Sequence, residues 1–345
     1  MQGQLKEVFR QGWPDPSKGS PDSARVRPLL QHAREIFAHH FGVRPDEIYF
    51  VGEPPISFHL TINGLLAENA TLHYATTDRQ PVHAIAHQRV NSGFPVHLHE
   101  VDSHGQISTC TVENNDVYIY QPINPETGIY RKPPDTAGTD ARIVVDNTAF
   151  GINPPLPKNW SAAIWQSRSW QGPAGLGVFA LQTGALWRNP LPSIDNEKVP
   201  QSFSVPLALA SALALENFVT LFEQSRSEIE HLKSRIIHFL TSVIGDVHIA
   251  RSSDSSRDLF SLISCAISGV DSEKLVRDLS ERGFDVDTGS ACISSNMAPS
   301  HVFAAMGIPT TGNLRLTLHP QTESEQVEAL MVALKECVMA QRTQL

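Results

Sequence analysis

Residues 287–307 read DTGSACISSNMAPSHVFAAMG, and residues 313–334 read NLRLTLHPQTESEQVEALMVAL. The first stretch places a single thiol, Cys292, among glycine, serine and alanine, and Pro-Ser-His then begins a helical pattern. Small residues leave a loop conformational freedom, which suits a thiol that must move into and out of a pocket. The second stretch alternates like a strand around Arg315 and continues as an amphipathic helix. The two stretches predict a compact α+β unit that carries a candidate nucleophile.

Upstream of this unit, short apolar runs alternate with longer stretches, as in a mainly parallel sheet built from βαβ units. A helix is predicted over 24–41 with Gly42 as its stop, and one long helical pattern, or two, over 206–244. In the closing helix, Thr322 and Glu325 predict a capping box. The predicted strands are IYFVG (48–52), TLHY (71–74), PVHLHEV (95–101), VYIYQPI (117–123), RIVVDNT (142–148), AAIWQS (162–167), GLGVFAL (175–181), LFSLISCAI (259–267) and NLRLTL (313–318).

The expected architecture is therefore α/β with two domains. Residues 1–220 form a large domain with a mainly parallel sheet, and residues 221–345 form a smaller C-terminal α+β domain. The long helical pattern over 206–244 joins the two domains. A chain of 345 residues with 41% hydrophobic residues has enough apolar material for such cores.

Composition excludes several function classes. The formal net charge is −9 and no run is rich in Lys or Arg, which argues against binding to nucleic acid or to an anionic membrane. We expect no membrane span and no secretory signal, because no sufficiently long apolar run occurs. The four cysteines lie far apart and predict reduced thiols in a cytoplasmic protein, and no Cys/His spacing predicts a metal site.

The C-terminal stretches resemble cysteine desulfurases, which have the class V aminotransferase fold of fold type I pyridoxal phosphate enzymes. The Ser/Thr-Gly-Ser-Ala-Cys loop, the Pro-Ser-His helix start and the Arg-bearing strand carry this resemblance. It implies that Cys292 is the nucleophile that becomes a persulfide and that Arg315 grips a substrate α-carboxylate. It also implies a homodimer and a protein partner that donates or accepts sulfur. A lone cysteine is more often a buried hydrophobe, and Arg315 could instead be a surface ion-pair partner.

Weaker matches extend the resemblance over nearly the whole chain, through RIVVDNT, SRSWQGPAGLGVFAL and QSFSVP. They imply that Asp146 pairs with the pyridinium nitrogen of the cofactor and that Ser204 replaces a phosphate-binding threonine. Ser169 stands where the family has the lysine that forms the Schiff base.

Other positions also depart from the family pattern. A serine cannot form an aldimine, and the turn expected to hold the cofactor phosphate reads Gly-Glu-Pro-Pro at 52–55. From these departures we expect that the chain has no cofactor. The substituted family positions are Glu53, Pro54 and Pro55 in the phosphate turn, Arg79 for the ring-stacking histidine, Pro125, Ala149, Arg168 and Ser169.

Three functions stay open from the sequence. The first is a pseudoenzyme or a sulfur-accepting partner that acts through Cys292. The second is a divergent desulfurase or related lyase that binds pyridoxal phosphate without the lysine. The third is a dimeric anion-binding module in which Arg79, Arg168 and Arg315 converge, although three separate surface arginines are the simpler interpretation.

Overall fold

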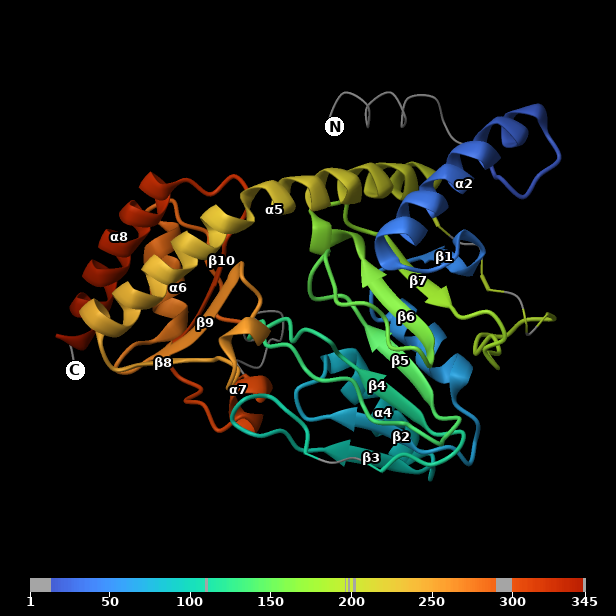
Figure 1. The fold of residues 1–345 in the computed structure, drawn as a ribbon, viewed down its shortest axis with the longest axis horizontal. Helices are drawn as coiled ribbons and strands as arrows, with labels where there is room; N and C mark the ends of the chain where they lie inside the picture. Colours follow the sequence, from blue (N-terminus) through green and yellow to red (C-terminus); the bar gives the residue numbers. More distant parts are fainter. Residues whose placement is uncertain are drawn as a thin grey trace.

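The computed structural model describes residues 14–108, 111–195, 197, 199–200, 203–289 and 300–343. Two sheets organise this part of the chain, and one long helix reaches from the first to the second (Figure 1). We call the part around the first sheet the large lobe and the part around the second the small lobe. The predicted mixed α/β fold with a mainly parallel sheet is confirmed.

The large lobe contains a seven-stranded sheet in the order β1-β7-β6-β5-β4-β2-β3. Strands β3, β2, β4, β5 and β6 run parallel to one another, whereas β7 is antiparallel to both β6 and β1. The central strands are apolar on both faces, as expected for a sheet covered on both sides. The bounds are Ile48–Val51 (β1), Leu72–Ala75 (β2), Val96–His99 (β3), Val117–Tyr120 (β4), Arg142–Asp146 (β5), Trp160–Gln166 (β6) and Gly177–Leu181 (β7).

The helices of the large lobe follow the local signals of the sequence. Helix α2 begins after Ser20, whose side chain caps it, and ends at Gly42, which has a φ of 68°. Such a left-handed residue after a helix favours glycine. The elements are Pro21–Phe41 (α2), Pro45–Glu47 (η1), Ile56–Phe58 (α3), His59–Asn63 (η2), Gln80–Asn91 (α4) and Ser167–Trp170 (η3).

The small lobe is built on a three-stranded antiparallel sheet in the order β10-β9-β8. Strand β8 was not predicted, because it is only three residues long. The capping box of α8 is formed by Glu323 and Gln326, one residue after the predicted pair, while the Thr322 hydroxyl accepts from His319 N. The elements are Val247–Ile249 (β8), Ser255–Arg257 (η5), Leu262–Ile267 (β9), Ser272–Ser280 (α6), His301–Ala305 (α7), Asn313–Thr317 (β10) and Ser324–Arg342 (α8).

Helix α5 (Val205–Phe239) continues without a break into η4 (Leu240–Ile244) and connects the lobes. Its length and composition would allow it to cross a membrane, but half of its most apolar window is buried inside the protein. The core helix of a soluble protein satisfies the same criteria, so a single such helix is weak evidence for a membrane span. Position 220 lies inside α5, and the domain boundary there stays a proposal.

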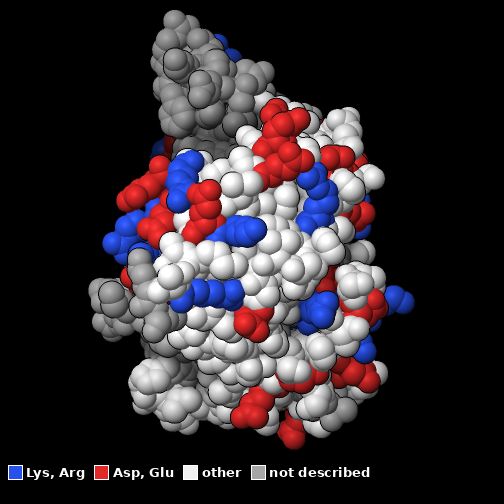
Figure 2. All heavy atoms as spheres, turned by 90° about the vertical axis from the view of Figure 1, so that its left-hand side faces the viewer, with Lys and Arg blue, Asp and Glu red and all other residues white. Residues whose placement is uncertain are grey.

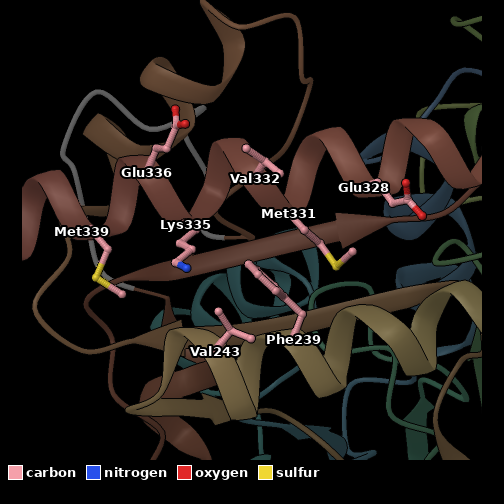
Figure 3. A pocket seen from close by; sticks show the side chains of 8 residues that line it. All are labelled: Phe239, Val243, Glu328, Met331, Val332, Lys335, Glu336 and Met339. Carbon is pink, nitrogen blue, oxygen red and sulfur yellow. The ribbon is translucent and has the colours of Figure 1, made fainter.

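An apolar groove of about 650 Å³ lies on the small lobe between the end of α5 with η4 and one face of α8 (Figure 3). Phe239 and Val243 line one side, and Met331 and Met339 lie opposite them. On the surface at this end of the molecule, acidic and basic side chains are interspersed (Figure 2).

Aromatic side chains join α5 to both lobes. Phe222 is 1% exposed, and its ring centroid lies 5.2 Å from that of Phe150 in the large lobe and 6.0 Å from that of Phe260 in the small lobe. Phe218 of the same helix adds a contact at 4.3 Å. This cluster fixes the position of α5 between the two sheets.

We predict that Phe222→Ala lowers the free energy of unfolding by about 3–5 kcal/mol, because it leaves a cavity among three rings. The measurement is equilibrium unfolding in urea. Leu221→Ala is the matched control on the same helix. Leu221 is 39% exposed, and its removal should change stability by about 0.5 kcal/mol. Equal losses in the two variants would contradict the role of the cluster.

Candidate functional site

Polar side chains gather where the parallel strands of the large lobe end. The carboxyl ends of β2, β4, β5 and β6 share one edge of the sheet, which is where ligands bind in open α/β sheets (Figure 1). This edge faces the small lobe across the loops that follow the strands. The side chains there are Thr77, Asp78 and Arg79 after β2, Gln121 and Asn124 after β4, Asp146 and Thr148 at the end of β5, and Gln166 and Ser169 at the end of β6.

Asp146 is the centre of this group and is 1% exposed. Its Oδ1 accepts from the backbone N and the hydroxyl of Thr148, at 3.0 and 2.5 Å, and its Oδ2 accepts from Gln121 Nε2 at 3.1 Å. The Nε of Arg79 lies 3.7 Å from the same Oδ2. Burial lowers the pKa of Arg79, and the Asp146 carboxylate opposes that shift. The buried carboxylate is thus satisfied by a cation and three hydrogen bonds from the chain itself.

A second buried ion pair holds the turn that carries Arg79. Arg131 Nη1 lies 3.1 Å from Asp78 Oδ1, and its Nη2 donates to the Thr77 hydroxyl at 2.5 Å. Asp78 Oδ2 also accepts from Ala75 N at 2.8 Å. Burial raises the pKa of Asp78, and the Arg131 charge opposes this. A cavity of about 10 Å³ beside Thr77 and Arg131 has room for about one water molecule.

Ser169 lies in η3, directly after β6. Its hydroxyl donates to Gln166 O at 2.8 Å. The turn is anchored by Trp170, which is fully buried and donates from Nε1 to Ser211 O on α5. Arg168 pairs instead with Glu53 at 2.8 Å, and its side chain is 63% exposed.

Arg315 on β10 approaches the site from the small lobe. Its Nη1 donates to Pro125 O at 3.1 Å, which ties it to the loop after β4. Its Nη2 donates to Asp287 Oδ2 at 2.5 Å. The Arg315 charge lowers the pKa of Arg79, so the two guanidinium groups share one electrostatic environment.

Glu126, in that same loop, lies under the small lobe and is 6% exposed. Its Oε1 accepts from the hydroxyl of Ser300, and a Cβ added to Gly289 would lie 2.8 Å from its Cγ. Burial raises the pKa of Glu126 to about 7, although the Ser300 hydrogen bond and the Arg315 charge act against this. Glu126 therefore holds the residues on either side of 290–299 against the large lobe.

The structure brings some predicted residues together and separates others. Asp146 and Ser169 lie at the same sheet edge, and Arg315 faces it from the small lobe. Ser204 is the N-cap residue of α5, without a side-chain capping hydrogen bond. Cys292 lies outside the described residues. The three arginines weighed as a possible anion site each pair with a different carboxylate: Arg79 with Asp146, Arg168 with Glu53 and Arg315 with Asp287.

Several site residues were not found from the sequence. Gln121 and Asp78 follow the ends of β4 and β2, and that position was the signal that could have found them. Arg131 lies in the loop after β4 and carries no such signal. Asp287 and Glu126 flank recognised motifs but carry no pattern of their own.

Among the described residues, no group of three or more His, Cys, Asp or Glu side chains could hold a metal ion. The titratable cluster at the sheet edge formed by β3 is instead internally hydrogen-bonded. His73 lies between Asp116 Oδ2, at 3.0 Å, and His99 Nε2, at 3.1 Å. Burial, with help from the nearby His97, lowers the pKa of His99 to about 4.

Comparison with known proteins identifies relatives of this chain and structures with the same fold. The model of the aminotransferase class-V family matches residues 16–330. The cysteine desulfurase IscS of Clostridium botulinum strain Hall is 23% identical over 367 residues, which cover 98% of this chain and 91% of that protein. The IscS of Methanosarcina thermophila is 25% identical over 336 residues, covering 90% and 81%.

Solved structures show the same fold. A NifS-like protein superposes with a TM-score of 0.84 at 20% identity and covers 99% of this chain and 96% of its own. The apo cysteine desulfurase of Thermococcus onnurineus NA1 superposes with a TM-score of 0.79 at 16% identity, covering 98% and 92%.

These matches contradict the prediction that the chain has no cofactor. The matched family is pyridoxal phosphate-dependent, and nothing in the matches indicates that the cofactor has been lost. The prediction gave too much weight to single substitutions. A covalent link is only one of several independent contacts that hold a cofactor, so its loss does not establish that the cofactor is absent.

The side chains around Asp146 nevertheless do not fit the lysine-bound form of pyridoxal phosphate. A Schiff base needs an amine, and Ser169 supplies a hydroxyl that is already hydrogen-bonded to Gln166 O. The carboxylate of Asp146 already has the guanidinium of Arg79 beside it.

We predict that Arg79→Gln destabilises the protein by about 1–3 kcal/mol, because it leaves Asp146 a buried carboxylate without a cation. Arg168→Gln is the matched control, since the exposed pair with Glu53 should contribute less than about 1 kcal/mol. Thermal unfolding of both variants checks this. A loss for Arg168→Gln as large as that for Arg79→Gln would contradict it.

The raised pKa of Glu126 predicts a pH dependence. The group titrates near 7 in the folded protein and near 4.5 when unfolded, so the folded state holds more protons between these values. Stability from this group is present below pH 4.5 and is lost as the pH rises to 7. Glu126→Gln keeps an acceptor for Ser300 and removes the titration. Relative to wild type, the variant should gain about 2–3 kcal/mol between pH 4.5 and 7.5. If the free energy of unfolding changes with pH equally in wild type and Glu126→Gln, the titration of Glu126 near pH 7 is ruled out.

Proposed function

This chain belongs to the class V aminotransferase family, and we propose that it is a cysteine desulfurase-like protein that accepts sulfur as a persulfide on Cys292. The single observation that carries the proposal is that position 169 holds a serine in place of a lysine. The Ser169 hydroxyl is bound to Gln166 O and supplies no amine. A chain that made persulfide from free cysteine would need such an amine to form the aldimine and to move the Cα proton. Sulfur that arrives already as a persulfide does not need it.

The small lobe supports the second half of the proposal. Arg315 faces the sheet edge, and Glu126 contacts Gly289 and Ser300, which flank the segment that contains Cys292. These contacts connect that segment with the polar edge of the large lobe.

Two other cysteines, Cys265 and Cys337, are poorly suited to accept sulfur. Cys265 is fully buried, and burial raises the pKa of its thiol to about 12. Cys337 is also buried, and the pKa of its thiol is raised for the same reason. The thiolate is the nucleophilic form, so neither group is suited to attack at neutral pH. Cys292 instead follows Gly289, Ser290 and Ala291 in the sequence.

The proposed transfer exchanges one persulfide for another. The thiolate of Cys292 attacks the outer sulfur of a persulfide on a donor protein, and a bond from its Sγ to that sulfur forms. The donor's S–S bond breaks, and its electron pair leaves on the donor thiolate, which takes up the proton lost by the Cys292 thiol. The exchange involves no net oxidation or reduction and needs no further reactant.

We further propose that the chain acts as a cytoplasmic homodimer with a sulfur-donor or sulfur-acceptor protein as its partner. We place the interface on the large lobe, where two large apolar side chains are exposed. Leu186 is 72% exposed and Ile56 is 52% exposed. Light scattering coupled to gel filtration measures the oligomeric state.

The sulfur-transfer proposal predicts that a cysteine desulfurase loaded with persulfide transfers one sulfur atom to Cys292. The measurement is mass spectrometry of peptides after mixing, with alkylation to trap the product. Cys292→Ser should abolish the added sulfur.

Cys337→Ser is the matched control and should leave the label in place, because Cys337 is buried. Labelling at another cysteine, or no labelling of a correctly folded chain, would contradict the proposal. Sulfur appearing on Cys292 from free cysteine alone, without a donor protein, would instead identify an active desulfurase.

A further inference from the structure

Asp287 and Arg315 are held together by their backbones as well as by their charges. Arg315 N donates to Asp287 O at 2.6 Å, and Asp287 N donates to Arg315 O at 3.2 Å. This two-way bridge keeps the two backbones side by side, and the Asp287 side chain places Oδ2 2.5 Å from Nη2 of Arg315. A rotation of the Asp287 side chain can end the ion pair while the backbones stay paired.

The ion pair uses only part of what the guanidinium offers. A guanidinium binds a carboxylate best through two parallel N–H donors. Asp287 gives Arg315 one oxygen, because its other oxygen, Oδ1, accepts from Gly289 N at 3.1 Å. The Nε of Arg315 is buried and has no hydrogen-bond partner in the described part of the chain. One donor of the fork is thus left for a ligand.

The exposures of the two side chains allow exchange. Asp287 is 48% exposed, whereas Arg315 is 25% exposed. Water can solvate the aspartate when it releases the arginine, while the guanidinium stays fixed by Pro125 O. The second guanidinium that acts on this space, Arg79, also has a buried Nε without a hydrogen-bond partner among the described residues.

We propose that Asp287 is an internal substitute for the carboxylate of a small amino acid, which displaces it from Arg315 on binding. The inference rests on the proposed function only in taking the chain as cysteine desulfurase-like. The class of ligand follows from the guanidinium of Arg315, whose planar fork suits a carboxylate. Asp287 then sets the affinity of the site for carboxylates and keeps Arg315 neutralised when no ligand is bound.

The test is calorimetric titration of the full chain with L-serine, which has the size of cysteine but no thiol and cannot transfer sulfur. Asp287→Asn keeps the shape and an acceptor for Gly289 N but removes the charge. We expect it to bind L-serine about five- to tenfold more tightly than wild type, since the arginine is no longer held by a competitor. Ethanolamine, which lacks the carboxylate, should show no gain.

Two further variants separate this role from a structural one. Arg315→Lys should weaken L-serine binding, because it removes the planar fork. Glu336→Gln breaks an ion pair of the same length elsewhere in the small lobe, 2.5 Å from Arg282, and should leave the affinity unchanged.

An Asp287→Asn protein with the wild-type melting temperature and an unchanged affinity for L-serine would overturn the inference. An equal gain for ethanolamine, or no L-serine binding by any variant, would also overturn it. If Asp287→Asn does not fold, Asp287→Ser takes its place with the same expected result. Sulfur transfer is read on Cys292 by mass, so a failure of the proposed function would be seen separately from a failure of this binding.

Discussion

The arrangement of the site in the large lobe depends on one buried carboxylate, that of Asp146. A charge that is 1% exposed costs several kcal/mol unless cations and donors surround it. Thr148 and Gln121 supply donors from the ends of β5 and β4, and Arg79 supplies the charge from the end of β2. Meeting this requirement brings the ends of three parallel strands into one cluster, and the Asp78–Arg131 pair then fixes the turn that presents Arg79.

The other arginines near the site are also paired with carboxylates. Each arginine that the family pattern assigns to the pocket region has a carboxylate of its own, and these pairs join separate segments of the chain. Glu53 meets Arg168 near the end of β6, and Asp287 meets Arg315 on β10. A site with its charges paired internally can exist without a ligand, and any ligand must then compete with an existing partner. The family therefore determines the fold, which is that of pyridoxal phosphate enzymes. It does not determine the residue at position 169, where this chain lacks the amine of the lysine-bound form.

The small lobe brings Arg315 and the residues that flank the Cys292 segment to the polar edge of the large lobe. Helix α5 and the ring cluster around Phe222 set how the two sheets face each other. Across that junction, Glu126 contacts Ser300 and Gly289, and Pro125 O holds Arg315. A sulfur-accepting cysteine needs access to a partner more than it needs a deep cavity. The glycine and serine residues close to Cys292 in the sequence suit that need.

The sequence by itself determined the elements and the family. Short apolar runs located most strands, Gly42 marked the end of α2, and the motif around Cys292 indicated the desulfurase-like family. These signals are local, because an apolar run and the end of a helix depend on neighbouring residues. Charge partners were decided only by the tertiary structure. Arg79 meets Asp146 because β2, β4 and β5 are adjacent in the sheet, and Asp287 meets Arg315 because two segments of the small lobe form a bridge. Such pairings depend on which segments become neighbours in space, and no local pattern in the chain encodes that.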